Sequence, residues 1–422
     1  MTTNTPPPTN PSPTDPSLTN PSPTDPSPTT DPSRRGGRRG PTFVLAPDSF
    51  KESMTAAQVC EAMERGLRDA FPQATFVHVP MADGGEGTVQ SLVDATGGRL
   101  VRRRVRGPLG AEVDAEYGIL GRRSEADELV GVVEMASASG LHHVPTAARD
   151  ARVTTTYGTG QLVAALLDEG VDRLIVGLGG SATNDAGAGL AQALGARLLD
   201  ADGAELEPGG AALAGLERID ASDLDPRLRR LRIDVACDVT NPLCGDDGAS
   251  AVYGPQKGAT PEVVAELDAA LGVFAQAVSS QLGRDVADVP GAGAAGGLGA
   301  GLLAFTEAQL RKGVDIVIEH VDLRAHVEGA DLVITGEGRI DGQTRFGKTP
   351  FGVSRVARAC GKPVIGIAGS LGPGVEDLYG DVFDAVFPVI GALQPLPEAL
   401  ADGATNVERT CRNLGHVLRL TL

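Results

Sequence analysis

The chain has 422 residues, a formal net charge of −18 and no tryptophan. Its length allows two domains, and its strong negative charge argues against nucleic acid and anionic membrane surfaces as partners. The five cysteines are scattered without a CxxC spacing, which indicates reduced thiols in a cytoplasmic protein rather than disulfides or a zinc site. We also expect no membrane-spanning segment, because no apolar run approaches the required length.

The first 41 residues differ from the rest of the chain in composition. TNPSPTDPSL at 9–18 is nearly repeated at 19–28, and a basic run follows at 34–39. A segment this rich in Pro, Ser and Thr, with no apolar pattern, cannot offset the entropy of ordering by burying a core. The sequence therefore predicts a disordered tail over 1–41, to which we assign no role.

The folded part is expected to begin with a strand, a helix and a second strand. The apolar strand 43–46 runs into Asp48 and Ser49, and Thr55 with Gln58 then has the spacing of a helix capping box. The second strand, 75–79, runs into an acidic turn with paired glycines at 82–87. Because ligands of open α/β sheets bind at the carboxyl ends of strands, both turns are candidate binding loops.

Short β segments are expected over 100–105, 111–120 and 129–134, before a hydroxyl-rich turn at 154–160. Threonines and glycines in such a turn can hold a phosphate or carboxylate. They are equally good helix N-caps, so both interpretations of this turn remain open.

The stretch RLIVGLGGSATNDAGAG at 173–189 gives the strongest local pattern in the chain. An apolar strand ends at a glycine turn that opens a helix of small residues, an arrangement in which backbone N–H groups can bind a phosphate. Ser181 adds a hydroxyl group. Asp185 places a carboxylate where a metal ion could lie beside the phosphate. The alternative is a tight βα turn in which Asp185 is only a helix cap.

Two familiar nucleotide motifs occur later in the chain, each in an unfavourable context. GxGxxG at 291–296 follows a polar segment ending in proline rather than the strand that a dinucleotide site requires, which disfavours NAD binding. GxxxxGKT at 342–349 matches the Walker A pattern, but six residues separate it from the predicted strand 331–335. We therefore disfavour a P-loop, although Lys348 could still reach a phosphate.

Taken together, the turns resemble the bacterial glycerate kinase family, the type without a P-loop. The matching pieces are APDSFKES (46–53), ADGGEGT (82–88), EMASASGL (134–141), GLGGSATND (177–185), ACDVTNPL (236–243), GPQKGA (254–259), PGAGAAGG (290–297), ITGEGRID (334–341) and IGIAGS (365–370). These blocks run in order from about residue 43 to near the end of the chain. The departures are small: the family often has glycine where this chain has Ala186, and Arg345-Phe346 is not an expected pair.

The resemblance implies ATP- and Mg²⁺-dependent phosphorylation of D-glycerate, with 2-phosphoglycerate as the expected product, in glyoxylate or sugar-acid breakdown. The implied fold class is α/β with two domains. A Rossmann-like domain with a parallel sheet would be built from both chain ends, at 42–80 and 290–422, and an inserted α/β domain would span 81–289. The resemblance leaves open whether the 2- or 3-hydroxyl is phosphorylated, and whether the protein is a monomer or a homodimer.

Phosphoryl transfer needs cations, a metal ion and a carboxylate near the attacking hydroxyl, and the turns offer each. The candidate catalytic residues are Asp185, Lys51 and Asp238, of which Asp185 and Asp238 are also the candidate metal ligands. The candidate phosphate- and substrate-binding residues are Asp48, Ser49, Gly84, Gly85, Thr154, Gly179, Gly180, Ser181, Thr183, Asn184, Asn241, Lys257, Glu337, Arg339, Asp341 and Lys348. The sequence does not say which turns bind ATP and which bind glycerate.

Two other functions compete with the kinase. A non-catalytic regulator of the same fold could bind a sugar acid or a nucleotide, but acidic groups at turn after turn argue against it. A nicotinamide oxidoreductase would use the Gly291 loop, which lacks both its strand and a carboxylate for the ribose.

Overall fold

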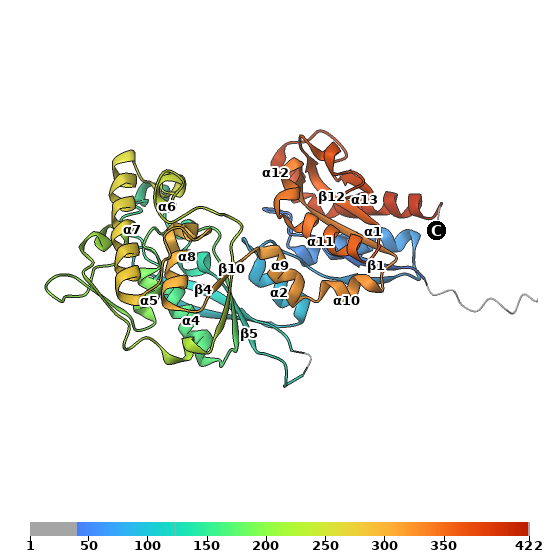
Figure 1. Ribbon diagram of the computed structural model, residues 1–422. Coiled ribbons are helices and arrows are strands. Elements are labelled where there is room, and N and C mark those ends of the chain that lie inside the picture. Colours follow the sequence, from blue (N-terminus) through green and yellow to red (C-terminus); the bar gives the residue numbers. More distant parts are fainter. Residues whose placement is uncertain (1–39, 123, 421–422) are drawn as a thin grey trace, which may run out of the picture. The chain divides into compact units, whose positions relative to one another are not determined.

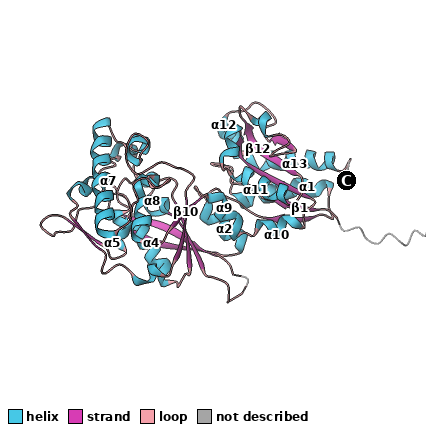
Figure 2. Cartoon of the chain, viewed as in Figure 1, coloured by secondary structure: helices cyan, strands magenta, loops and turns pink. Residues whose placement is uncertain are grey.

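A computed structural model of the chain describes residues 40–122 and 124–420, which form two main β-sheets and the helices around them (Figures 1 and 2). The predicted disordered tail, apart from residues 40 and 41, lies outside the described residues.

The first sheet has five strands, all parallel, drawn from both ends of the chain. Its order is β13-β12-β11-β1-β2. The strands are β1 (Thr42–Leu45), β2 (Thr75–His78), β11 (Leu332–Ile340), β12 (Val364–Leu371) and β13 (Ala385–Pro388). The predicted Rossmann-like sheet built from the two chain ends is confirmed.

Helices cover both faces of the first sheet. The helices around it are α1 (Ala56–Ala70), α9 (Gly313–His320), α10 (Leu323–Glu328), α11 (Thr349–Ala359), α12 (Leu396–Ala401) and α13 (Gly403–Leu418). Helix α2 (Thr88–Thr96) follows β2 but packs against the second sheet. Phe43 of β1 packs in the core shared with α1 and α13. Its neighbour Val44 packs in the core shared with α9 and α11. This alternation follows from the two-residue period of a strand buried on both faces. The capping box at Thr55 and Gln58 is formed as predicted.

The second sheet has six strands in the order β10-β9-β6-β5-β4-β3. Its strands are β3 (Arg99–Arg106), β4 (Glu112–Ile119), β5 (Val130–Glu134), β6 (Arg173–Gly177), β9 (Arg232–Ala236) and β10 (Gln309–Arg311). The pairs β3–β4 and β4–β5 are antiparallel, whereas the pairs from β5 to β10 are parallel. The remaining elements are α3 (Met135–Ser139), α4 (Tyr157–Asp168), α5 (Ala188–Ala193), the ribbon β7 (Arg197–Leu199) and β8 (Arg218–Asp220), α6 (Ala249–Tyr253), α7 (Pro261–Leu282) and α8 (Ala294–Phe305).

Sheet membership corrects the predicted boundary at residue 290. β10 pairs with β9 in the second sheet, and Leu298 and Leu302 of α8 pack in the core of that sheet. The chain therefore returns to the first sheet only after Arg311, about 20 residues later than predicted. The glycine-rich run at 290–297 packs against backbone rather than beginning a new domain: a β-carbon at Gly296 would lie 1.9 Å from the Thr183 carbonyl oxygen.

Helix α7 is long and apolar enough to cross a membrane by length and composition alone, contrary to our expectation that no such segment occurs. Core helices of globular proteins pass the same test. Leu267, Leu271 and Phe274 on α7 are fully buried, and the latter two pack in a core cluster of the protein. We therefore interpret α7 as a core helix.

The chain passes between the two sheets at two places that touch each other. Gly84 lies between β2 and α2, and Gly313 opens α9 after β10. A β-carbon at Gly84 would come within 2.9 Å of the Gly313 α-carbon, and one at Gly313 within 1.9 Å of the Asp83 carbonyl oxygen. Only glycine permits this close approach of two backbones.

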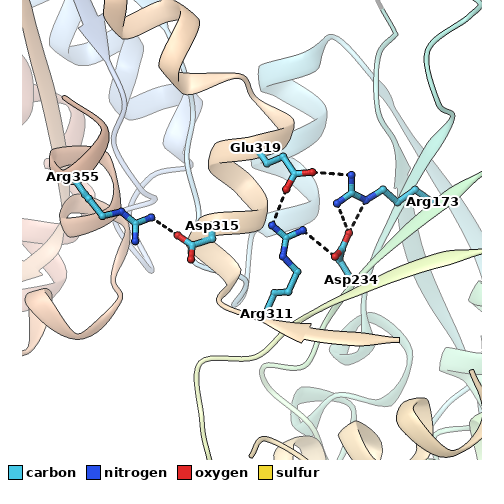
Figure 3. A network of polar contacts seen from close by, with 6 residues as sticks. All are labelled: Arg173, Asp234, Arg311, Asp315, Glu319 and Arg355. Atoms are coloured by element: carbon cyan, nitrogen blue, oxygen red, sulfur yellow. Dashed lines mark hydrogen bonds and ion pairs between the residues drawn. The ribbon is translucent and has the colours of Figure 1, made fainter. Parts of the chain in front are cut away.

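Helix α9 is held at this junction by charged side chains (Figure 3). Asp234 of β9 pairs with Arg173 of β6 at 2.6 Å and with Arg311 of β10 at 3.0 Å. Both arginines also reach Glu319 of α9, at 2.8 and 2.7 Å. On the other side of α9, Asp315 pairs with Arg355 of α11. Because two arginines and two carboxylates satisfy one another, this network fixes α9 against the second sheet.

Candidate functional site

Asp48 follows β1 at the carboxyl edge of the first sheet and is held by three donors. Its Oδ1 accepts the Ser49 N–H at 2.6 Å and the Ser49 hydroxyl at 3.2 Å, and its Oδ2 accepts the Thr349 hydroxyl at 2.5 Å. Burial raises the pKa of Asp48 to about 6, and the charge of Asp83 adds to this shift. A carboxyl group with such a pKa is ionised at neutral pH and still basic enough to accept a proton.

Asp238 follows β9 and approaches the same point from the second sheet. Its Oδ1 accepts the N–H of Gly313 at 3.2 Å, at the start of α9. The Asp238 side chain keeps access to solvent, yet partial burial, and then the charge of Asp83, raise its pKa to about 6. Asp83 therefore acts on both Asp48 and Asp238, and its carboxyl group lies near each of theirs.

Glu337 and Lys348 form a further charged pair at this edge. The Lys348 Nζ lies 3.5 Å from Glu337 Oε2, and the Thr344 hydroxyl donates to Glu337 Oε1 at 2.8 Å. Burial raises the pKa of Glu337 to about 7, although Lys348 opposes the shift. The pair adds one cation to a region that otherwise gathers carboxylates.

Asp48, Asp83 and the Glu337–Lys348 pair line a cavity of about 460 Å³, which we call the first-sheet cavity. Its charged and hydroxyl-bearing lining residues are Asp48, Ser49, Lys51, Ser53, Asp83, Glu337, Arg339, Lys348 and Ser370. Its apolar lining comes from Phe50 and from residues between Val389 and Gly403. Six of the predicted site residues thus meet in one cavity.

A second cavity of about 440 Å³ adjoins the first and shares Ser49, Lys51 and Ser53 with it. We call it the connecting cavity. Its lining is rich in hydroxyl and amide groups, and Lys51 is its one basic side chain among the described residues. Through Glu86, Gly87 and Gln90 it continues into a third cavity of about 850 Å³ beside the second sheet, the second-sheet cavity.

The Walker-like stretch at 342–349 follows a strand more closely than predicted. β11 extends to Ile340, so only Asp341 separates the strand from Gly342. It is nevertheless no phosphate cradle. The N–H groups of Gly342, Gln343 and Thr344 donate to Pro373, to the Asp341 carboxylate and to the Asp341 carbonyl at 2.9 to 3.0 Å. Since these donors are already engaged, the objection to a P-loop holds for a different reason from the one given.

The 177–185 turn departs most from its predicted role. Asp185 is fully buried, and its carboxylate accepts hydrogen bonds from the N–H and hydroxyl of Thr156 at 2.8 and 2.9 Å and from the N–H groups of Gly187 and Gly189 at 3.2 and 3.3 Å. Burial raises the pKa of Asp185, and these donors oppose the shift. The structure argues against the predicted catalytic and metal-binding role, because no face of this carboxylate is open to a ligand.

The side chains around Asp185 are buried with it. Thr154 donates to the Ala182 carbonyl at 2.9 Å, Asn184 donates to Ser250 at 2.9 Å, and Lys257 donates to the Thr183 carbonyl at 2.6 Å. Burial lowers the pKa of Lys257 to about 7. These residues hold the turn in place and do not offer a surface for phosphate. Gly179 and Gly180 are exposed, and they line the second-sheet cavity, while Ser181 is buried.

The buried Thr183 hydroxyl has no hydrogen-bond partner among the described residues, whereas the remaining predicted residues have structural partners. Asn241 uses both ends of its amide, donating to the Asp247 carbonyl at 2.8 Å and accepting from the Tyr253 hydroxyl at 2.7 Å. Asp341 caps the turn after β11 and pairs with Arg339 at 3.1 Å. Gly84 and Gly85 lie at the junction of the sheets, where the Gly85 N–H donates to Asp83 at 3.1 Å.

With this geometry in view, comparisons with known proteins identify the family. The family description "Glycerate kinase family" matches residues 43–419. The chain belongs to the glycerate kinase family. It is 53% identical over 376 residues to a glycerate kinase of Halalkalibacterium halodurans, covering 89% of this chain and 98% of the relative. It is also 50% identical to the glycerate 2-kinase of Escherichia coli K12, covering 90% and 98% of the two chains.

A solved structure agrees with these matches. A crystal structure described as that of a glycerate kinase 2 from Salmonella typhimurium LT2 superposes with a TM-score of 0.83 at 51% identity, covering 90% of this chain and 99% of that one. The resemblance drawn from the turns is thereby confirmed, and so is the expectation that this glycerate kinase family member is an enzyme.

Sequence reasoning missed several residues that line the cavities. Asp83 was passed over in favour of the glycines beside it, although it follows β2 just as Asp48 follows β1. His142 lines the second-sheet cavity, and partial burial lowers its pKa. The apolar residues from Val389 to Gly403 carried no recognisable motif, so only the folded structure could reveal them.

The carboxylates fit the kind of magnesium site that a kinase uses. Among the described residues no three His, Cys, Asp or Glu side chains come together as a complete metal site. Mg²⁺ in phosphoryl-transfer enzymes is commonly held by one or two carboxylates together with substrate phosphates and water. Asp83 and Asp238 would fit that donor set, because a cation between them would offset the repulsion that Asp83 exerts on Asp238 and on Asp48.

Proposed function

We propose that this chain transfers the terminal phosphoryl group of ATP to D-glycerate in the cytoplasm, with Mg²⁺, to give 2-phosphoglycerate. The observation that carries the proposal is the gathering of Asp48 and Asp83 with Lys51 and the Glu337–Lys348 pair in one cavity, with Asp238 close enough to Asp83 for their charges to interact. A kinase needs such a combination because charge spreads over the transferred group while a hydroxyl proton leaves.

Asp48 is the residue we assign as general base. It lines the first-sheet cavity directly before Ser49, which lines both that cavity and the connecting cavity. Its pKa of about 6 suits proton acceptance at neutral pH. Ser49 and Thr349 fix the orientation of its carboxylate. In this proposal Asp48 takes the role that the sequence analysis gave to Asp185.

Lys51 and Lys348 are the cations that would face the phosphates, and Asp83 and Asp238 would hold Mg²⁺. When bound, the metal ion supplies charge neutralisation of the phosphate oxygens. Lys51 is exposed, so it can reach a ligand in either cavity that it lines.

We place D-glycerate in the connecting cavity. Lys51 can pair with its carboxylate, and Ser49, Gln90 and Ser91 can bond its hydroxyl groups. The connecting cavity is lined by two carboxylates, Glu52 and Glu86, beside Lys51. The second-sheet cavity suits an anion less well, because four carboxylates line it beside one arginine, Arg102. A hydroxyl bound in the connecting cavity would lie next to the cavity that contains Asp48.

The proposal is tested with the purified chain, ATP, Mg²⁺ and D-glycerate, following ADP release by a coupled assay and identifying the product by ³¹P NMR. We expect turnover that needs all three components and a phosphate ester on C2. A phosphate on C3 would correct the regiochemistry, and absence of any glycerate-dependent turnover would overturn the function.

A matched pair of variants tests the glycerate site. Gln90→Leu should raise KM for glycerate about tenfold, as expected for the loss of a hydrogen bond to bound substrate, and should leave KM for ATP unchanged. Gln161→Leu, on α4 outside the connecting cavity, is the control. Equal glycerate KM values for the two variants would contradict the placement.

A further inference from the structure

The first-sheet cavity has one charged side and one apolar side. The apolar side consists of Phe50, Val389, Ile390, Leu396, Ala399 and Leu400. The segment from Val389 to Gly403 that supplies most of it begins immediately after β13, and Ser53 ties α12 to the loop after β1 by donating to the Leu400 carbonyl at 2.6 Å. The apolar side is thus a built part of the cavity wall and not a loose loop.

The strand order places most of the charged side at a distance from the β13 edge. Reading along the carboxyl edge of the sheet, Val389 follows β13, Ser370 ends the run of β12, Glu337 lies on β11, Asp48 follows β1 and Asp83 follows β2. Apolar side chains therefore lie at the β13 edge of the sheet, and charged side chains lie at the ends of the strands from β11 to β2. A ligand lying along this edge would meet apolar surface at one end and charges at the other.

Large apolar side chains on this wall remain open to solvent. Ile390 is 40% exposed and Leu396 is 67% exposed. Exposed apolar groups at the rim of a cavity mark a ligand or partner surface more often than chance, and a cavity of about 460 Å³ is in the range of small-molecule sites.

We infer that this apolar wall holds the purine base of the nucleotide donor, with the triphosphate directed toward Lys51 and Lys348. The inference rests on the proposed kinase function and adds to it a base-binding site on the 389–403 segment. Glycerate needs no apolar surface of this extent, since it has three carbon atoms, each bearing oxygen. A nucleoside triphosphate combines a flat, largely apolar base with a polyanion, and it matches both sides of the cavity.

The absence of tryptophan from the chain allows a direct binding test. Leu396→Trp introduces a single fluorophore on the proposed base-binding wall. Leu393→Trp introduces one on the same segment, at a fully exposed side chain outside the cavity lining. We expect ATP and AMP to quench the fluorescence of the first variant with saturation, because an adenine ring stacks on the indole, and to leave the second unchanged.

Inorganic tripolyphosphate and glycerate are the matched ligands. Tripolyphosphate should bind the charged side without quenching the Leu396→Trp fluorophore, whereas saturable quenching by glycerate would show that the acceptor occupies this wall and would overturn the inference. Equal responses of the two variants to ATP, or no response in either, would also overturn it.

A charge on the wall provides a second test. Leu396→Asp should raise the Kd for ATP, measured by isothermal titration without glycerate, at least about tenfold, while Leu393→Asp stays within about twofold of the parent chain. If Leu396→Asp and the parent chain have equal Kd values for ATP while the parent phosphorylates glycerate, the base-binding site is contradicted and the kinase function is not. If the parent chain does not phosphorylate glycerate at all, the proposed kinase function itself is contradicted.

Discussion

Two acidic, glycine-rich turns look alike in the sequence and do different things in the structure. The 177–185 turn follows β6 and contains Asp185, and the 82–87 turn follows β2 and contains Asp83. Asp185 is fully buried and has its four donors supplied by Thr156, Gly187 and Gly189. Asp83 accepts one backbone N–H, from Gly85, and lines a cavity.

The comparison teaches that a carboxylate after a glycine turn identifies a site only when the surrounding chain leaves its oxygens free. Local spacing predicts that a turn and a helix start are present, but it does not say which donors reach the side chain. For Asp185 the decisive donor, Thr156, comes from the start of α4, a separate element.

The largest effect is expected from Asp83→Asn. Removing a carboxylate that faces the reacting groups should lower kcat/KM for glycerate at least about a hundredfold, while the free energy of unfolding stays the same or increases as repulsion with Asp48 and Asp238 is relieved. Steady-state kinetics and urea unfolding provide the two readouts. Asp202→Asn, at an exposed position outside the cavities, is the control. A mild kinetic effect at Asp83 would remove Asp83 from the mechanism.

The converse pattern is expected for Asp185→Asn. An amide nitrogen would face N–H and hydroxyl donors that now meet a carboxylate oxygen, so the chain should lose about 2 to 3 kcal/mol of unfolding free energy. The folded fraction should keep kcat/KM within about tenfold of the parent. A large decrease in kcat with an unchanged free energy of unfolding would show that Asp185 acts in catalysis, and the two turns would then not differ in role.

Glu337→Gln tests whether the ionised Glu337 side chain in the first-sheet cavity lowers the free energy of unfolding. The folded-state pKa of Glu337, about 7, lies above its ordinary value of 4.5. Between these two pH values the folded chain binds more protons than the unfolded chain. The free energy of unfolding therefore falls as the pH rises through this range. The variant should therefore be more stable than the parent at pH 8, by on the order of 1 to 2 kcal/mol, with the difference shrinking toward pH 4.5. Thermal unfolding across this pH range measures it, and a pH-independent difference would contradict the assignment.

The smallest effect on activity is expected from Lys257→Met, beneath the 177–185 turn. The folded-state pKa of Lys257 is lowered to about 7 from 10.5, so the unfolded chain binds more protons between these values and stability should rise with pH across that interval. Asp185 is the charged group that acts on this lysine. The variant should flatten this rise in stability, by up to about 1.4 kcal/mol for each pH unit between the two pKa values, whereas Lys362→Met should keep it.

Much of the fold could be predicted from the sequence because it depends on local patterns. The capping box at Thr55, the strands that precede Asp48 and Asp83, and the parallel sheet from both chain ends follow from periodicity and from the resemblance. The point at which the chain returns to the first sheet was misplaced, because the short strand β10 has no sequence signal apart from its pairing with β9.

The site could be predicted only in part, for a physical reason. Asp48, Lys51 and Glu337 were found because they follow or lie on strands whose carboxyl ends meet at one edge. The burial of Asp185 and Lys257 depends on packing between elements far apart in the sequence. The apolar wall from Val389 to Gly403 likewise has no meaning until it lies beside the charged residues.

The contact between Gly84 and Gly313 has a consequence for the order in which the chain folds. β1 pairs with β11 through Phe43 and Leu332, so the first sheet closes a loop of nearly 300 residues. The entropy lost on closing a flexible loop grows with its length. Since the intervening segment leaves and returns at touching points, an insert that has already folded presents β2 and α9 to each other across a short distance. Early folding of the second sheet would thereby convert the most distant strand pairing of the protein into a nearly local one.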